Sequence, residues 1–305
     1  LMQPHAMRKL EGNYKFPADL GGSRKHHHAI DIALGKKLTS DIMRQLRRPG
    51  TITGVDAASC YDRIVHSMVI LIARQAGFHI LPLITLFGVI QNMQYYVRTG
   101  FGDSEKFYGG KKGVPFQGTC QGNGASPAYW LIITMIMVGA MYKTGNFTEL
   151  KFPITKKKTL KNMGFIFVDD TDLITIGNDE ETANEVRQRK QSATTQWENL
   201  LEITGGALKP SKCYWYLIDF KFHQGEWRYA DTTEYTCKIQ GEGDSPHLIK
   251  SLAADEPREI MGVWQNLSGE NTKQIEETIN KHLGKIRKLQ TSTLERKVVW
   301  RGMIG

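Results

Sequence analysis

The sequence predicts an α+β fold, in which helices pack against a mainly antiparallel sheet. Three observations indicate this class. Two strand-like runs, 165–168 (FIFV) and 173–176 (LITI), are separated by only four residues, a spacing typical of a tight hairpin. A third run, 51–55 (TITGV), is also strand-like. A 14-residue apolar run, 129–142, is long enough for a buried helix but too short to span a bilayer, so we expect no membrane partner.

The strand over 51–55 ends at Asp56, and a helix is expected to follow it. The residues after Asp56 place apolar side chains at helical spacing, namely Ile64, Met68, Leu71, Ile72 and Ala76. Ser126 and Pro127 suit the N-cap and first turn of the apolar helix.

Two more helices are predicted from capping and periodicity. Asn178 with Glu181 is a capping-box signal for a helix that Gly205 and Gly206 end. Its apolar face comprises Ala183, Val186, Ala193, Trp197, Leu200 and Leu201. From Ile275 onward, apolar residues at helical spacing predict an amphipathic helix with exposed lysines and arginines.

Composition and charge exclude several classes of protein. The chain has 305 residues, of which 40% are hydrophobic and 23% charged, so it is neither disordered nor fibrous and has room for about two domains. Its net charge of +9 favours polyanionic partners such as nucleic acid or acidic lipid. Four scattered cysteines without metal-ligand spacing indicate free thiols in a reducing, intracellular compartment, either nuclear or cytoplasmic. Both ends of the sequence suggest a fragment of a longer protein.

Adjacent carboxylates mark the predicted hairpin. Asp169 and Asp170 lie between apolar strands, where two unpaired negative charges repel strongly, so a cation is expected beside them. Hard divalent ions prefer carboxylate and phosphate oxygens, and Asp56, at the end of another strand, would complete a two-ion site. The alternative interpretation is ordinary turn chemistry, because Asp favours turns.

Five segments in order resemble motifs A to E of the reverse transcriptases, of the retroelement type found in retrotransposons and group II introns. Residues 55–64 (VDAASCYDRI) resemble motif A and residues 119–130 (TCQGNGASPAYW) resemble motif B. FVDD at 167–170 is similar to the motif C hairpin, and GGALKPSKC at 205–213 to motif D. REIMGVW at 258–264 is a weaker match to motif E.

The resemblance implies an RNA-directed DNA polymerase, a nucleotidyltransferase that adds dNTPs to a DNA or RNA primer on an RNA template. It implies two Mg²⁺ ions, with Mn²⁺ as a substitute, held by Asp56, Asp169 and Asp170. It also implies that Tyr61 excludes a 2′-hydroxyl and that Lys212 is the general acid toward pyrophosphate. The remaining nucleotide-binding positions would be Ala57, Ala58, Ser59, Cys60, Gln121 and Gly122.

Each of these residues also has an ordinary structural interpretation. Cys60 suits a small buried filler, Tyr61 a core tyrosine and Lys212 a surface lysine. Gln121 and Gly122 suit a plain loop before a helix. The histidines at 26–28 follow Arg24 and Lys25, and they suit either phosphate contacts or a solvated basic turn.

The implied architecture is a right-hand polymerase with partial fingers over 1–50, a palm over 51–265 and the start of a helical thumb over 266–305. Residues 214–259 lengthen the interval between motifs D and E, and we expect them to form a β-rich insertion. Two other functions stay open. A non-catalytic reverse-transcriptase-like nucleic-acid-binding or splicing-helper protein would keep the fold, whereas a two-metal nuclease has no use for Tyr61 or the motif B loop.

Overall fold

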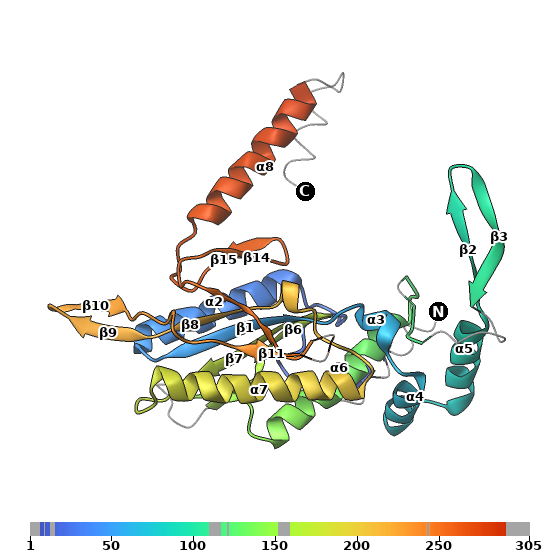
Figure 1. Ribbon diagram of the computed structural model, residues 1–305, viewed down its shortest axis with the longest axis horizontal. Helices are drawn as coiled ribbons and strands as arrows, with labels where there is room; N and C mark the ends of the chain where they lie inside the picture. The colour runs from blue at the N-terminus through green and yellow to red at the C-terminus, as the bar shows by residue number, and fades with distance from the viewer. Residues whose placement is uncertain are drawn as a thin grey trace.

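The computed structural model describes residues 7–8, 10–12, 16–109, 117–120, 122–151, 159–241, 243 and 245–290, with the backbone alone over 287–290. It contains helices and strands mixed along the chain, around one five-stranded sheet (Figure 1). The sheet has the order β13-β8-β1-β7-β6. Its strands are β1 (Gly50–Asp56), β6 (Gly164–Phe167), β7 (Asp170–Ile176), β8 (Tyr214–Ile218) and β13 (Lys250–Leu252). All neighbours are antiparallel except β13 and β8, which are parallel.

The sheet separates two hydrophobic clusters, and its strands alternate between them. In β8, Trp215 contributes to one cluster and Tyr216 to the other. The first cluster includes residues of α6 (Ser126–Lys143) and α7 (Ala183–Ile203), and the second includes Met43 of α2 (Ala29–Leu46). Figure 1 shows α7 along one side of the sheet and α2 on the other. This alternation decides which strand residues face α2, because side chains two apart share a face.

The chain after β1 folds into three short helices rather than one. They are α3 (Cys60–Arg63), α4 (His66–Gln75) and α5 (Ile80–Asn92). The extended backbone at Ile64 (ψ 127°) and Val65 (ψ 120°) separates α3 from α4. A hairpin of β2 (Gln94–Thr99) and β3 (Gly102–Gly109) follows and projects from the molecule (Figure 1).

Both predicted helix starts differ in detail from the structure. The N-cap of α6 is Ala125, because the Ser126 hydroxyl donates instead to the carbonyls of Thr119 and Cys120. Asn178 and Glu181 do exchange hydrogen bonds, but the turn they close precedes α7. A second capping box, Thr182 with Glu185, begins the helix. The sequence contains two such signals in a row, and the second one is used.

Helix α7 buries a lysine. The Lys190 side chain is 1% exposed, and its ammonium lies 4.1 Å from the centroid of the Trp215 ring. No described oxygen or nitrogen atom accepts a hydrogen bond from the ammonium, and the Cys237 thiol is its polar neighbour. Burial is the main cause that lowers the pKa of Lys190 to about 8.

The segment 214–259, expected to be an insertion, consists of a strand of the central sheet followed by two small hairpins and further short strands. Its first segment, β8, lies between β1 and β13 and is therefore a central strand of the sheet, which corrects the boundary predicted from sequence. Two small hairpins follow, β9 (Phe220–His223) with β10 (Glu226–Tyr229) and β11 (Lys238–Ile239) with β12 (His247–Leu248). Tyr214–Ile218 is buried throughout, which explains why it belongs to the core rather than to a surface addition.

The remaining elements lie at the edges of this core. Strands β4 (Thr148–Lys151) and β5 (Thr159–Asn162) pair with each other, as do β14 (Arg258–Ile260) and β15 (Val263–Gln265). The last helix, α8 (Thr272–Gln290), matches the amphipathic pattern from Ile275, but Ile275, Ile279 and Leu283 are exposed. All four cysteines are free thiols. Among the described residues, no helix combines the length and apolarity needed to cross a membrane.

Candidate active site

Three predicted carboxylates lie at one end of two neighbouring strands. The antiparallel register of β1 and β7 places Asp56 directly opposite Asp170. Asp169 is in the two-residue turn between β6 and β7, where Phe167 pairs with Asp170. Val168, the first residue of this turn, has a φ of 61°, as the tight hairpin types require. Residues far apart in the sequence are thus adjacent in the sheet.

The side chains of these carboxylates do not form a ready metal cage. Within the part of the chain that the structure describes, no group of three or more His, Cys, Asp or Glu side chains is arranged to hold a metal ion. The Asp56 carboxylate is instead paired with Lys212, whose Nζ lies 3.0 Å from Oδ2. An ammonium therefore supplies the positive charge at Asp56.

The surroundings of Asp170 disfavour the ionised form of its carboxyl group. Its side chain is exposed to solvent in a recess, yet the surrounding protein raises the pKa of Asp170 to about 6. Desolvation is the largest cause, followed by the negative charges of Asp169, Asp172 and Asp56, while Lys212 opposes them. Negative charge at the hairpin tip is therefore only partly compensated, a situation that a further cation would relieve.

The loop that carries Lys212 is fixed to the end of β1. The backbone N–H of Lys209 donates to the Asp56 carbonyl at 2.9 Å, and that of Ala58 donates to the Ala207 carbonyl at 2.8 Å. Lys212 ends the short 3₁₀-helix Pro210–Lys212, and its side chain is 54% exposed. Its hydrogen bond to Asp56 raises the pKa of Lys212, so the ammonium stays protonated.

Tyr61 and the motif B segment are held together by hydrogen bonds. The Tyr61 carbonyl accepts from the Thr119 backbone N–H at 2.6 Å. The Tyr61 ring meets the Trp130 indole edge-on, with centroids 6.5 Å apart. The Trp130 Nε1–H in turn donates to the Val168 carbonyl at 2.6 Å. Three distant segments thus meet at the turn that carries Asp169.

Trp130 was not singled out from the sequence, where it forms part of the apolar run. An indole N–H needs a hydrogen-bond partner when it is buried, and Trp130 is only 4% exposed. That requirement was the available signal that Trp130 contacts a backbone carbonyl outside its own helix.

The small residues after Asp56 are mostly buried. Ala57, Ala58 and Cys60 are at most 8% exposed, whereas Ser59 is exposed. Burial is the main cause that raises the pKa of the Cys60 thiol to about 12, in keeping with a small buried filler. The Ala58 N–H is already bonded to the Ala207 carbonyl and is therefore not available to a ligand.

The motif B loop is described only in part. Gln121 lies outside the described residues. Gly122 has a φ of 92°, and no atom lies within 4 Å of the position that a Cβ would take. Position 122 therefore favours glycine because of its positive φ, and not because a larger side chain would clash with its neighbours.

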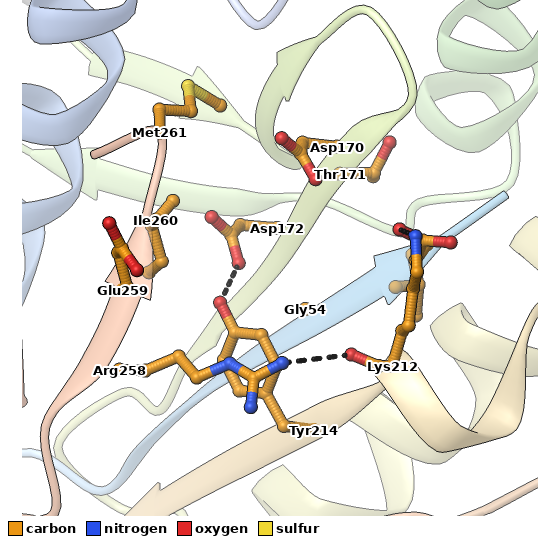
Figure 2. Close-up of a pocket in the computed structure, with 12 residues that line it drawn as sticks. Gly54, Asp170, Thr171, Asp172, Lys212, Tyr214, Arg258, Glu259, Ile260 and Met261 are labelled. Atoms are coloured by element: carbon orange, nitrogen blue, oxygen red, sulfur yellow. Dashed lines mark hydrogen bonds and ion pairs between the residues drawn. The ribbon is translucent and has the colours of Figure 1, made fainter. Parts of the chain in front are cut away.

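A buried polar triad lies behind the carboxylates, and the sequence analysis missed it. Lys36 Nζ is 3.0 Å from Asp172 Oδ2 and 3.1 Å from the Tyr214 hydroxyl oxygen. The Tyr214 hydroxyl donates to Asp172 Oδ1 at 3.0 Å (Figure 2). Burial lowers the pKa of Lys36, and Asp172 opposes that effect. Asp172 is two positions after Asp170 and therefore lies on the same face of β7. An acid at this position, within a strand that is otherwise apolar, was the sequence signal for a buried cation beside it.

A cavity of about 290 Å³ opens beside the carboxylates. Asp56 is among the residues that line it. Figure 2 shows Asp170 and Lys212 along one part of the cavity and Arg258 with Ile260 of β14 along another. The Arg258 guanidinium donates to the Lys212 carbonyl at 3.4 Å and lies 4.8 Å from the centroid of the Tyr214 ring. The β14–β15 hairpin therefore borders the carboxylate cluster.

The histidine run precedes α2 as a polar turn. His26 and His28 are exposed, and the His28 backbone N–H donates to the Asp31 carboxylate at 2.8 Å. Arg24 donates to the Leu20 carbonyl at 2.8 Å. These contacts fit the solvated basic turn considered from the sequence.

Comparisons with known proteins give distant similarities. No protein-family model matches the chain, and no curated protein matches its sequence. A telomerase from Candida tropicalis, solved with the TWJ fragment of telomeric RNA, has 15% identity and a TM-score of 0.43 over 71% of this chain and 32% of its own. Apo telomerase from the same organism, truncated from the C-terminal domain, has 14% identity and a TM-score of 0.41 over 79% and 42%. Candida albicans telomerase with the TWJ fragment has 14% identity and a TM-score of 0.37 over 79% and 35%. The chain thus spans between 32% and 42% of the length of these telomerase chains.

Proposed function

We propose that this chain is the catalytic region of an RNA-directed DNA polymerase, which adds dNTPs to a primer 3′-hydroxyl along an RNA template. One observation carries the proposal. The register of β1 and β7 brings Asp56 opposite Asp170, beside Asp169, and the loop fixed to the end of β1 places Lys212 Nζ 3.0 Å from the Asp56 carboxylate. The segments that resemble motifs A, C and D therefore converge at one end of one sheet.

The donor set at this end fits Mg²⁺. Asp56, Asp169 and Asp170 offer hard carboxylate oxygens. Desolvation and, after it, the neighbouring carboxylates raise the pKa of Asp170, and a cation would compensate the negative charge of those carboxylates. These three residues would hold two Mg²⁺ ions, with Mn²⁺ as a substitute. When bound, the ions would lower the cost of ionising the primer hydroxyl and neutralise charge on the triphosphate.

Lys212 has the properties of a proton donor. Its ammonium is protonated, half-exposed and within reach of the carboxylate cluster. The ammonium would donate its proton at Nζ to the leaving pyrophosphate.

Substrate selection would depend on Tyr61 and its neighbours. The Tyr61 ring is supported edge-on by Trp130, so it has a fixed position from which to exclude a ribose 2′-hydroxyl. Backbone donors from Ser59 onward would contact the triphosphate, while Gln121 and Gly122 would support the base pair being formed. The side chains of Ala57, Ala58 and Cys60 would leave room for that contact.

The wider architecture follows the same proposal. Residues 1–50 would belong to the fingers, 51–265 to the palm and 266–305 to the thumb of a right-hand polymerase of retroelement origin. Exposed basic residues of α8, such as Lys281 and Lys285, would contact the phosphates of the template–primer duplex. The β14–β15 hairpin would lie between this helix and the carboxylates.

The test is primer extension on poly(rA)·oligo(dT) with dTTP and Mg²⁺. We expect incorporation by the wild type, none by Asp169→Ala, and wild-type rates for Asp231→Ala, which removes an exposed acid outside the site. Unfolding curves of both variants would show that they are folded. Incorporation by Asp169→Ala would refute the metal assignment, and duplex binding without incorporation by the wild type would favour a non-catalytic nucleic-acid-binding protein.

A further inference from the structure

The β9–β10 hairpin carries an aromatic surface that the proposed chemistry does not use. Its register pairs Phe222 with Trp227 and Phe220 with Tyr229. Opposed residues share a face of an antiparallel pair, and residues two apart share it as well. The rings in each pair have centroids 5.4 Å apart. We call this set of four rings the aromatic face.

Three rings of the aromatic face are open to solvent, whereas Phe220 is half-buried against the second hydrophobic cluster. Phe222 is 62% exposed, Trp227 50% and Tyr229 39%. The hairpin is a separate two-stranded sheet that extends past the end of the central sheet (Figure 1). A contiguous group of exposed large aromatic side chains marks an interaction site, in contrast to single exposed apolar residues.

The hairpin is shaped before any partner binds. Its turn residues Gln224 and Gly225 have φ values of 52° and 84°, the combination of a type I′ turn, which fits the twist of paired strands. At its base, the Ala230 N–H donates to the Asp219 carbonyl at 2.9 Å. Little conformational entropy would therefore be lost when a ligand stacks on the rings.

Cations border the aromatic face. The Arg47 guanidinium, at the end of α2, lies 5.6 Å from the Phe220 ring and 6.0 Å from the Trp227 ring. Arg47 makes no ion pair with another described residue, whereas Arg48 beside it is paired with an aspartate. Lys221 and Arg228 oppose each other on the other face of the hairpin, where Arg228 forms an ion pair with Glu226 at 3.3 Å.

From these contacts we propose that the aromatic face binds single-stranded nucleic acid. Unpaired bases would stack on Phe222 and Trp227, and Arg47 would contact the neighbouring phosphates. Exposed aromatic rings beside the Arg47 guanidinium suit a strand with unpaired bases, because bases can stack on the rings while a phosphate contacts the cation. The proposal needs no catalysis and does not rest on the proposed polymerase function.

The hairpin is distant from the carboxylate cluster. Ile218, which precedes the hairpin, pairs with Gly50 at the start of β1, while Asp56 is at the other end of that strand. Six residues of extended strand correspond to about 20 Å. Binding at the aromatic face is therefore a separate contact along a nucleic-acid strand.

The experiment compares labelled rU12, dT12 and a 12-base-pair duplex in fluorescence-anisotropy titrations. We expect Phe222→Ala/Trp227→Ala to lower the affinity for rU12 and dT12 at least tenfold and to change duplex affinity less than twofold. Leu248→Ala, which truncates an apolar side chain that is 64% exposed, is the control and should bind like the wild type. Arg47→Gln should weaken single-strand binding severalfold and reduce its salt dependence by about one phosphate contact.

If the double variant fails to fold the β9–β10 hairpin, a more conservative variant still tests the proposal. Trp227→Phe retains a stacking ring, so we expect affinity within threefold of the wild type. The quenching of tryptophan fluorescence that dT12 causes in the wild type should be smaller in this variant. Equal quenching in both proteins would overturn the proposal. Unchanged single-strand affinity in the double variant, or an equal loss for the duplex, would do so too, and a change confined to self-association would indicate a protein interface instead.

Discussion

Replacement of Lys190 by Met tests whether the buried ammonium destabilises the fold. A pKa lowered from 10.5 to about 8 corresponds to about 3 kcal/mol at neutral pH, since each pH unit is worth about 1.4 kcal/mol. The cation–π contact with Trp215 would offset up to about 2 kcal/mol of that cost. Methionine fills a similar volume without a charge. We therefore expect Lys190→Met to stabilise the protein by about 1–3 kcal/mol at pH 7.

The same substitution has a distinctive pH dependence. Between pH 8 and 10.5 the unfolded chain retains a proton on Lys190 that the folded chain has released, so the stability of the wild type rises with pH relative to the variant. The advantage of Lys190→Met should therefore shrink across this window. Groups common to both proteins cancel in the difference.

Urea unfolding at pH 7, 8, 9 and 10 measures this difference directly. Lys281→Met, which removes an exposed lysine, serves as the control and should show a small offset that does not vary with pH. Parallel pH profiles for the wild type and Lys190→Met, or a variant less stable than the wild type at pH 7, would show that the reasoning is wrong.

Three further predictions concern the candidate site. Lys36→Met leaves Asp172 buried without its cation and should cost about 3–5 kcal/mol in urea unfolding; a loss below 1 kcal/mol would contradict the role of the triad. Tyr61→Ala should admit ribonucleotides in primer extension, and an unchanged preference for dNTPs would count against a steric role. Gly54→Ala would place a Cβ 2.2 Å from a tyrosine ring and should lower the melting temperature, whereas Gly88→Ala, with open space around it in α5, should leave it unchanged or raise it; equal effects would contradict the packing argument.

Local patterns were sufficient to predict the elements that position the carboxylates. The strand before Asp56 and the hairpin around Asp169 and Asp170 have apolar runs bounded by acids, and the structure contains both. The register that brings Asp56 opposite Asp170 depends on long-range pairing, which no local pattern specifies. The carboxylate chemistry suggested this proximity, and the resemblance of the motifs to a known family supported it.

Other features depend on contacts between distant segments and could not be predicted. Tyr214–Ile218 has the composition of any buried strand, and only its pairing with β1 shows that it belongs to the central sheet. Lys36 carries no local signal of burial, because its partner Asp172 is far away in the sequence. The start of α7 was displaced by a few residues because the sequence contains two consecutive capping signals.

Through the hydrogen bond from the Trp130 indole to the Val168 carbonyl, α6 holds in place the turn that carries Asp169. A small shift of this helix along its axis would pull on the carbonyl that precedes Asp169 and so displace the acids. Substitutions deep in α6 would then change the spacing of the carboxylates without contacting them. Residues that pack tightly around α6 would therefore also preserve the geometry of the acids.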